Sequence, residues 1–158
     1  MTLRTKLIAC IGALTLLAAT GAAQADVTFK SPAKVQKALA TLNRVVDHTA
    51  RLIQAKNYPH LLHENDEFKE GSEALEKGIA KAPADFKAKV DPLLKQADAD
   101  SQSIADAATA KDDAKLAATH DALTNSVKAL LAAFPDNVQP PPPSASKEMK
   151  EDQAQDKK

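Results

Sequence analysis

Residues 112–134 read DDAKLAATHDALTNSVKALLAAF, and this stretch decides the fold. Its larger side chains recur at spacings of three and four residues, which places them along one face of an α-helix. The stripe consists of Leu116, His120, Leu123, Val127, Leu130 and Phe134. Pro135 follows directly and cannot continue a helix. The stretch therefore predicts an amphipathic helix that buries this stripe.

A second strong helix signal begins at Ser31-Pro32. Serine is favoured as an N-cap, and proline is favoured as the first residue of a helix. The apolar positions that follow are Val35, Leu39, Leu42, Val46, Thr49 and Ile53, with Ala38, Val45 and Leu52 broadening the stripe. The pattern predicts a helix that ends near Lys56-Asn57.

Two further helices are predicted between these, and each has an open feature. The first starts either at Tyr58-Pro59 or after a cap at Asn65-Asp66, and its apolar face is Phe68, Ser72, Leu75 and Ile79. The second opens at Pro83 and carries Phe86, Val90, Leu94, Ala97, Ser101, Ile104 and Ala108. Pro92 falls inside it, so this helix either kinks there or restarts with Asp91 as its cap.

The fold class follows from these four segments. Residues 26–139 hold 23 alanines and only two glycines, a composition that favours helix almost throughout. Four amphipathic helices joined by short links bury their apolar faces best against one another. We therefore expect an all-α, antiparallel four-helix bundle over residues 26–139.

The two ends of the sequence have different compositions. Arg4 and Lys6 precede an apolar run over residues 7–19, and Ala23-Gln24-Ala25 resembles a signal-peptidase site. This pattern is typical of a cleaved signal peptide over 1–25, so we expect export to the periplasm. Four prolines at 140–143 and a charged stretch after them predict a disordered tail over 140–158.

Composition excludes several function classes. The formal net charge is zero and aromatic residues are 3%, which argues against a nucleic-acid partner. The only cysteine is Cys10, inside the predicted signal peptide, so an internal disulfide and covalently attached haem c are both excluded. No nucleophile motif or glycine-rich phosphate loop occurs, and we expect no enzymatic activity.

The last predicted helix resembles the closing helix of the cytochrome c-prime family. That family ends with the form A-L-x-x-S-C-K-A-C-H-x-x-F, which Ala122, Leu123, Ser126, Lys128, Ala129 and Phe134 fit. Val127 and Leu130 stand where the two haem-bonding cysteines would be, and Leu131 stands where the iron-ligating histidine would be. The resemblance extends loosely over residues 31–134.

The resemblance implies a binding or interaction protein that has lost its haem. Members of the family are exported bundles that carry haem for electron transfer or for binding small gases. Thioether attachment needs thiols and axial ligation needs a donor atom, and the three aliphatic residues supply neither. The family also implies a homodimer through the first two helices. We expect no cofactor in this chain, although the histidines leave two alternatives.

The first alternative is a zinc or copper site. His60, His63, Glu64 and Glu67 would share one face if residues 59–67 are helical. Two imidazoles with a carboxylate suit either metal. The competing interpretation is a polar helix start, in which the acidic residues favour the helix dipole. The sequence offers no second histidine pair to complete such a site.

The second alternative is non-covalent haem b, held by two histidines. His120 lies on the apolar stripe of the last helix, and His48 lies at the edge of the first helix's stripe. Helices at these positions can be neighbours in a bundle, so the two imidazoles could ligate one iron. A buried histidine more often satisfies a structural hydrogen bond, and no methionine within 26–139 could serve instead.

Overall fold

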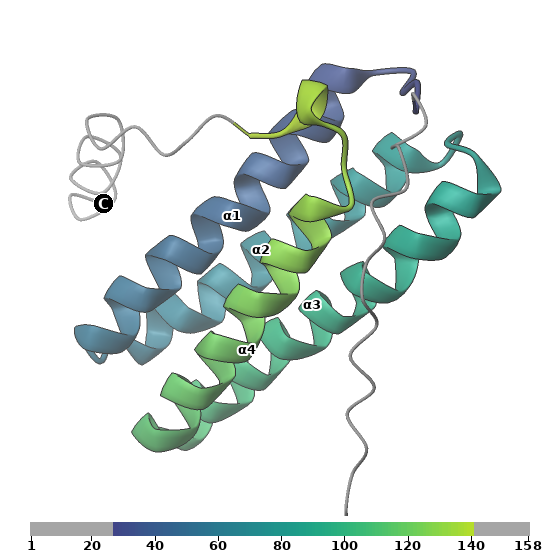
Figure 1. Cartoon of the computed structure of the whole chain (residues 1–158). Coiled ribbons are helices and arrows are strands. Elements are labelled where there is room, and N and C mark those ends of the chain that lie inside the picture. Colours follow the sequence, from purple (N-terminus) through teal and green to yellow (C-terminus); the bar gives the residue numbers. More distant parts are fainter. Residues whose placement is uncertain (1–26, 141–158) are drawn as a thin grey trace, which may run out of the picture.

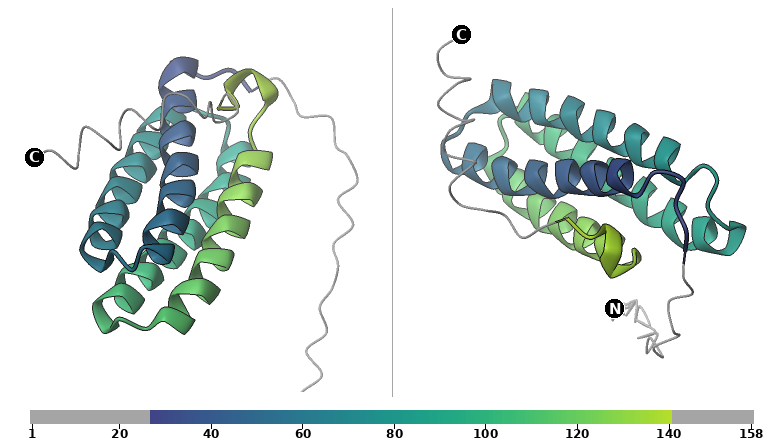
Figure 2. Two further views of the ribbon diagram at one scale, coloured as in Figure 1. Left: turned by 90° about the vertical axis from the view of Figure 1, so that its left-hand side faces the viewer. Right: turned by 90° about the horizontal axis from the view of Figure 1, so that it is seen from above.

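Four helices alternate in direction and pack side by side in the computed structural model of this chain, which describes residues 27–140 (Figure 1). The helices are α1 Pro32–Gln54, α2 Tyr58–Ile79, α3 Ala84–Ala110 and α4 Asp113–Ala132, followed by the 3-10 turn η1 Asp136–Val138. Each helix contacts the next, and α4 returns to contact α1 (Figure 2). The predicted antiparallel four-helix bundle is confirmed. The predicted signal peptide, and the predicted tail beyond Pro140, lie outside the described residues.

The helix starts agree with the sequence, although their caps differ. α1 begins at Pro32, but the Ser31 side chain makes no capping hydrogen bond, and the Ser31 carbonyl accepts from the Lys34 N–H at 3.0 Å instead. α4 is capped by a side chain, because Asp112 Oδ1 accepts from the Lys115 N–H at 3.0 Å. Proline therefore sets the start of α1, and a side-chain cap sets the start of α4.

Both open boundaries are settled. α2 starts at Tyr58 with Asn57 as its N-cap, so Asn65-Asp66 lies within the helix rather than before it. α3 continues through Pro92 as one helix, so Asp91 does not cap a new one. The Pro92 side chain is exposed. Proline at this position removes one backbone hydrogen bond of the helix.

The core is formed by the stripes that the periodicity predicts. Leu39, Leu42, Phe68, Leu75 and Leu94 are among the largest side chains that are fully buried. Burying a side chain of this size contributes about 1.5–3 kcal/mol. Two stripe residues, Ile53 and His120, are only partly buried, because they lie at the margins of their helix faces.

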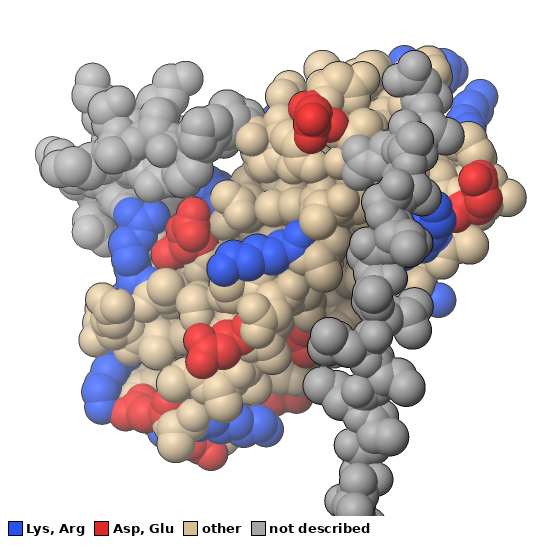
Figure 3. Space-filling model, in the orientation of Figure 1, with Lys and Arg blue, Asp and Glu red and all other residues tan. Residues whose placement is uncertain are grey.

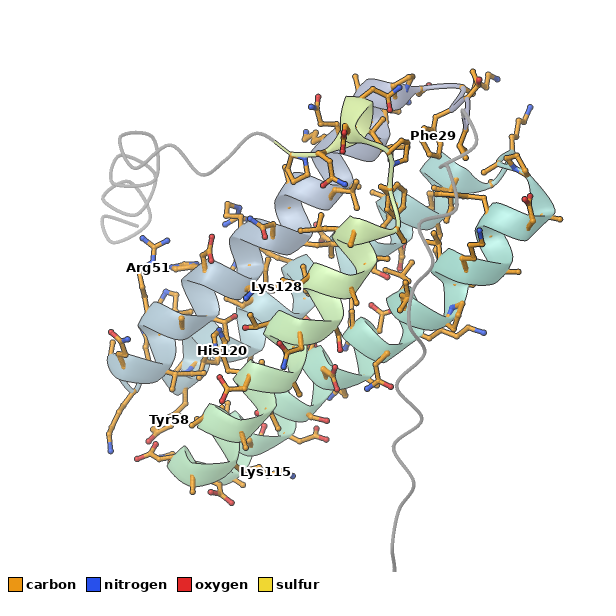
Figure 4. The ribbon with its side chains drawn as sticks, in the orientation of Figure 1. Phe29, Arg51, Tyr58, Lys115, His120 and Lys128 are labelled. Carbon is orange, nitrogen blue, oxygen red and sulfur yellow. The ribbon has the colours of Figure 1, made fainter. Side chains whose placement is uncertain are left out.

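The two ends of the bundle are closed differently. At one end, the rings of Phe29, Phe86 and Phe134 pack together with centroids 5.3 to 6.0 Å apart (Phe29 is labelled in Figure 4). At the other end, Asp113 at the start of α4 accepts a hydrogen bond from Tyr58 Oη at 2.8 Å and pairs with Lys56. The α1–α2 link is thereby tied to the start of α4.

The described surface carries charges of both signs. On the face shown in Figure 3, lysine, arginine, aspartate and glutamate side chains are interspersed over an otherwise uncharged surface. This is the pattern of an ordinary solvated surface. Within residues 27–140, no helix is both long enough and apolar enough to cross a membrane.

Candidate functional site

The three positions that distinguish this chain from the cytochrome c-prime form lie at the core. Val127 is 1% exposed and Leu130 is 0% exposed, both on the inner face of α4. Leu131 is partly buried against the core, and its carbonyl accepts from Gln139 Nε2 at 2.7 Å. These side chains pack against other apolar residues and offer no donor atom to a metal or a haem.

The residues that fit the family form lie on different faces of α4. Ser126 Oγ donates to Asp100 of α3, and Phe134 belongs to the aromatic cluster. Lys128, labelled in Figure 4, is exposed, as are Ala122 and Ala129. Helix packing accounts for Ser126 and Phe134, whereas nothing in the described structure explains Lys128.

His120 joins α4 to α1. Its Nε2 lies 3.1 Å from the carbonyl oxygen of Val46. Because a carbonyl only accepts, Nε2 carries the proton and donates. The imidazole therefore makes the structural hydrogen bond expected of a partly buried histidine, and this nitrogen has no lone pair left to ligate iron.

His48 is directed instead toward α2. Its Nδ1 lies 2.7 Å from Glu64 Oε1, and the two side chains are 13% and 4% exposed. Glu64 Oε2 is also buried and has no hydrogen-bond partner within the described residues. His48 and His120 are thus held by different partners, and a bis-histidine haem site would require both to leave them.

The four residues of the candidate metal site do not converge in this structure. His60 Nδ1 contacts its own helix cap, Asn57 Oδ1, at 2.9 Å. His63 Nε2 lies 3.4 Å from Glu67 Oε1, and Glu67 also accepts from Arg44. Glu64 is turned inward to His48. Over residues 27–140, no three His, Cys, Asp or Glu side chains gather as metal ligands.

The pairing of His48 with Glu64 was not predicted from the sequence, although a signal for it was present. A short link makes α1 and α2 antiparallel neighbours, so residues equally distant from the link face each other. His48 and Glu64 are each eight residues from Lys56. The register of the hairpin identifies this pair, whereas helical periodicity on α2 alone groups Glu64 with the two outer histidines.

Two carboxylates have shifted pKa values. The Lys56 hydrogen bond, followed by that of Tyr58, lowers the pKa of Asp113 below its usual 3.8. Burial raises the pKa of Asp98 above 3.8, although Ser72 Oγ donates to Asp98 Oδ2 at 3.0 Å and opposes this rise. Asp113 is therefore stabilised in its ionised form, whereas Asp98 is not.

A groove of about 580 Å³ follows the outer seam between α1 and α2. Small residues, including Ala38, Gly71 and Ala74, form its floor, and longer charged side chains form its rim. Four lining residues are basic and two are acidic. α1 and α2 pack closely along this seam because Gly71 has no side chain. A Cβ at this position would lie 3.0 Å from Leu42 Cδ2 and 3.2 Å from Thr41 Cγ2.

No family model, curated protein or solved structure matches this chain. The family relationship that the motif in α4 suggests therefore has no support from these comparisons. The four-helix bundle itself rests on the geometry described above.

Proposed function

We propose that this chain is an exported, non-enzymatic binding protein whose bundle resembles cytochrome c-prime without the haem. The observation that carries the proposal is the burial of Val127 and Leu130. These residues stand at the two thiol positions of the family form, and their aliphatic side chains fill the bundle core that α4 faces.

The packing of α4 supports this proposal in physical terms. A haem between the helices needs space in the core, thiols for attachment and a donor for the iron. Here the corresponding space is taken by side chains that stabilise the bundle through burial. Binding would then take place on the outer surface, where the groove along the α1–α2 seam offers a hollow.

The same resemblance implies a homodimer through α1 and α2, and we include it in the proposal. Sedimentation equilibrium over a wide range of protein concentrations tests it. The proposal predicts a mass that rises toward twice that of one chain as concentration increases. A mass that stays at one chain at every concentration would remove the dimer from the proposal and leave the haem-free bundle.

The absorption spectrum of protein purified from its native cell envelope tests the absence of haem. We expect no Soret band in this protein, and no stoichiometric band after incubation with haemin, because His48 and His120 have other partners. N-terminal sequencing of the same preparation should start at Asp26. A Soret band in the native protein would contradict the haem-free proposal.

Metal analysis of that preparation tests the remaining alternative. Titration with zinc and with copper is compared between the wild type and the His60→Ala, His63→Ala double variant. Equal affinity in both is expected, because these imidazoles are not assembled with a third ligand. Clearly tighter binding by the wild type would favour a metal site at the start of α2.

A further inference from the structure

The α1–α2 groove has a size typical of small-molecule sites. Its volume of about 580 Å³ lies within the roughly 300–1,000 Å³ of such sites. The floor is made of small residues, so a slim ligand can approach the helix backbones closely. α1 and α2 also pack closely at Gly78, near the start of α1, because a Cβ there would lie 3.0 Å from Val35 Cγ2.

The four basic residues of the rim are divided between the two ends of the groove, and the acidic Glu70 lies between Glu67 and Lys77 along α2. Arg44 and Glu67 pair with each other at the end nearer the α1–α2 link. At the other end lie Lys34, Lys37 and Lys77, and the Gly78–Val35 contact places position 77 beside position 34. This second end, defined by the three lysines, is here named the lysine end.

The positive charge of the lysine end is little neutralised by the protein. Lys34 and Lys37 make no ion pair with any residue of the described range. Lys77 pairs with Glu73 at 3.1 Å, but their side chains are 76% and 68% exposed, and such surface pairs contribute little. The cations therefore remain available to an anion in the groove.

Helix stability explains Lys77, which lies in the last turn of α2 where a basic residue is favourable, but it does not explain Lys34. The N-terminus of an α-helix carries partial positive charge, so acidic residues stabilise the first turn and basic residues oppose it. The first turn of α1 contains no acidic residue, and Lys34 lies within it. At the lysine end the N-terminus of α1 adds positive potential, whereas the C-terminus of α2, which ends at Ile79, adds negative potential, so the positive charge there comes from the lysine side chains.

We propose that the α1–α2 groove binds a small organic anion, whose phosphate or polycarboxylate head lies among Lys34, Lys37 and Lys77. The slim remainder of the ligand lies over Ala38, Gly71 and Ala74. Charge-assisted hydrogen bonds from three ammonium groups suit a multiply charged head, and phosphates and carboxylates share this chemistry. The inference goes beyond the proposed function, since it requires neither the loss of haem nor the dimer, whose proposed interface lies on the same two helices as the groove.

Calorimetric titration of the whole chain tests the site, with citrate and pyrophosphate as probes for the two kinds of head. The Lys34→Gln, Lys37→Gln variant should bind the preferred probe about tenfold more weakly or worse, because two charge-assisted contacts are lost. The control is Lys115→Gln, Lys128→Gln, which removes the same charge from exposed lysines of α4 (Figure 4). It should retain wild-type affinity.

A second variant blocks the groove without changing its charge. Ala74 is exposed on the groove floor, so Ala74→Phe should fill the groove, abolish binding and leave the helical circular dichroism unchanged. Absence of binding by both probes, or an equal loss in the α4 control, would overturn the anion site. A Soret band would contradict only the haem-free proposal, and sedimentation of the same variants would reveal any effect on a dimer.

Discussion

α4 and α2 are helices of similar length that bury different kinds of side chain. The fully buried residues of α4 are all aliphatic: Leu116, Leu123, Val127 and Leu130. α2 buries Leu61, Phe68, Leu75 and Ile79, but also Glu64, Asn65 and Ser72. Each of these polar residues faces a neighbouring helix. α4 also makes polar contacts, from His120 to Val46 and from Ser126 to Asp100, but these side chains are only partly buried, whereas these polar residues of α2 are buried.

The partners of α2 lie on both of its sides. Glu64 contacts His48 of α1, while Ser72 donates to Asp98 of α3. The side-chain amide of Asn65 lies 2.9 Å from Ser101 Oγ of α3. Buried polar groups are costly when a partner is missing, so these contacts favour one register of α2 over others. Apolar packing on α4 is less selective in this respect.

Truncating the centre of the α4 stripe should cause the largest loss of stability. Leu130→Ala removes a fully buried side chain, and we expect the free energy of unfolding to fall by about 2–5 kcal/mol. Chemical denaturation monitored by circular dichroism measures it. Leu131→Ala is the matched control, because Leu131 is only partly buried and should cost clearly less. Equal losses at the two positions would contradict the burial of Leu130.

The unfolding free energies of His48 and Glu64 variants should be coupled, unlike those of variants in the apolar stripe of α4. His48→Leu leaves the buried Glu64 carboxylate without its imidazole, which should lower the free energy of unfolding by about 1–3 kcal/mol. Adding Glu64→Met should recover much of that loss, because replacing both partners by apolar groups of similar size is nearly neutral.

The double-mutant cycle distinguishes coupling from simple damage. Unfolding free energies of the two single variants and the double variant are compared with those of the wild type. If the double variant loses the sum of the two single losses, His48 and Glu64 do not act as a pair. The same cycle on Leu130 and exposed Ala129 should give no coupling.

The contrast between the two helices explains what the sequence could predict. Periodicity predicts α4 well because all of its fully buried residues are aliphatic. Asp112 also supplies a recognisable N-cap. The signal of α2 was weaker because buried Glu64, Asn65 and Ser72 interrupt the apolar pattern. Its start at Tyr58 and its inward-facing Glu64 depend on partners in α1 and α3, which local sequence does not reveal.

The candidate sites follow the same division. Val127 and Leu130 could be placed in the core from their spacing alone. The groove could not be predicted, because it requires Lys34 and Lys37 of α1 to lie beside Lys77 of α2. Those charges come together only through the register of the two helices, which pack closely at Gly71 and Gly78.

A smaller effect is expected on the α3 side of α2, where burial raises the pKa of Asp98. The folded state then holds the Asp98 proton more tightly than the unfolded state, so stability from this group falls as pH rises from about 3.8 through the raised pKa. Asp98→Asn should therefore raise the free energy of unfolding at pH 7 by less than about 1 kcal/mol, since Asp98 is only partly buried and its charge is partly screened.

Denaturation at several pH values measures the Asp98 effect, with Asp66→Asn on the exposed face of α2 as the control. The advantage of Asp98→Asn over the wild type should disappear in acid, where Asp98 is protonated. An advantage that is independent of pH would show that burial of the charge is not its cause.

The smallest effect is expected where the starts of α2 and α4 meet. The Lys56 and Tyr58 hydrogen bonds lower the pKa of Asp113, so its contribution to stability is present above about 3.8 and is lost as pH falls through the lowered pKa. Asp113→Asn should lower the melting temperature slightly at pH 7, and the difference should vanish in strong acid and shrink in high salt. Asp121→Asn, an exposed residue farther along α4, removes the same charge without this tie. If Asp121→Asn lowers the melting temperature by as much or more, the exposed contacts of Asp113 with Lys56 and Tyr58 add nothing to stability. Packing and the buried polar pairs alone would then set the arrangement of α2 and α4.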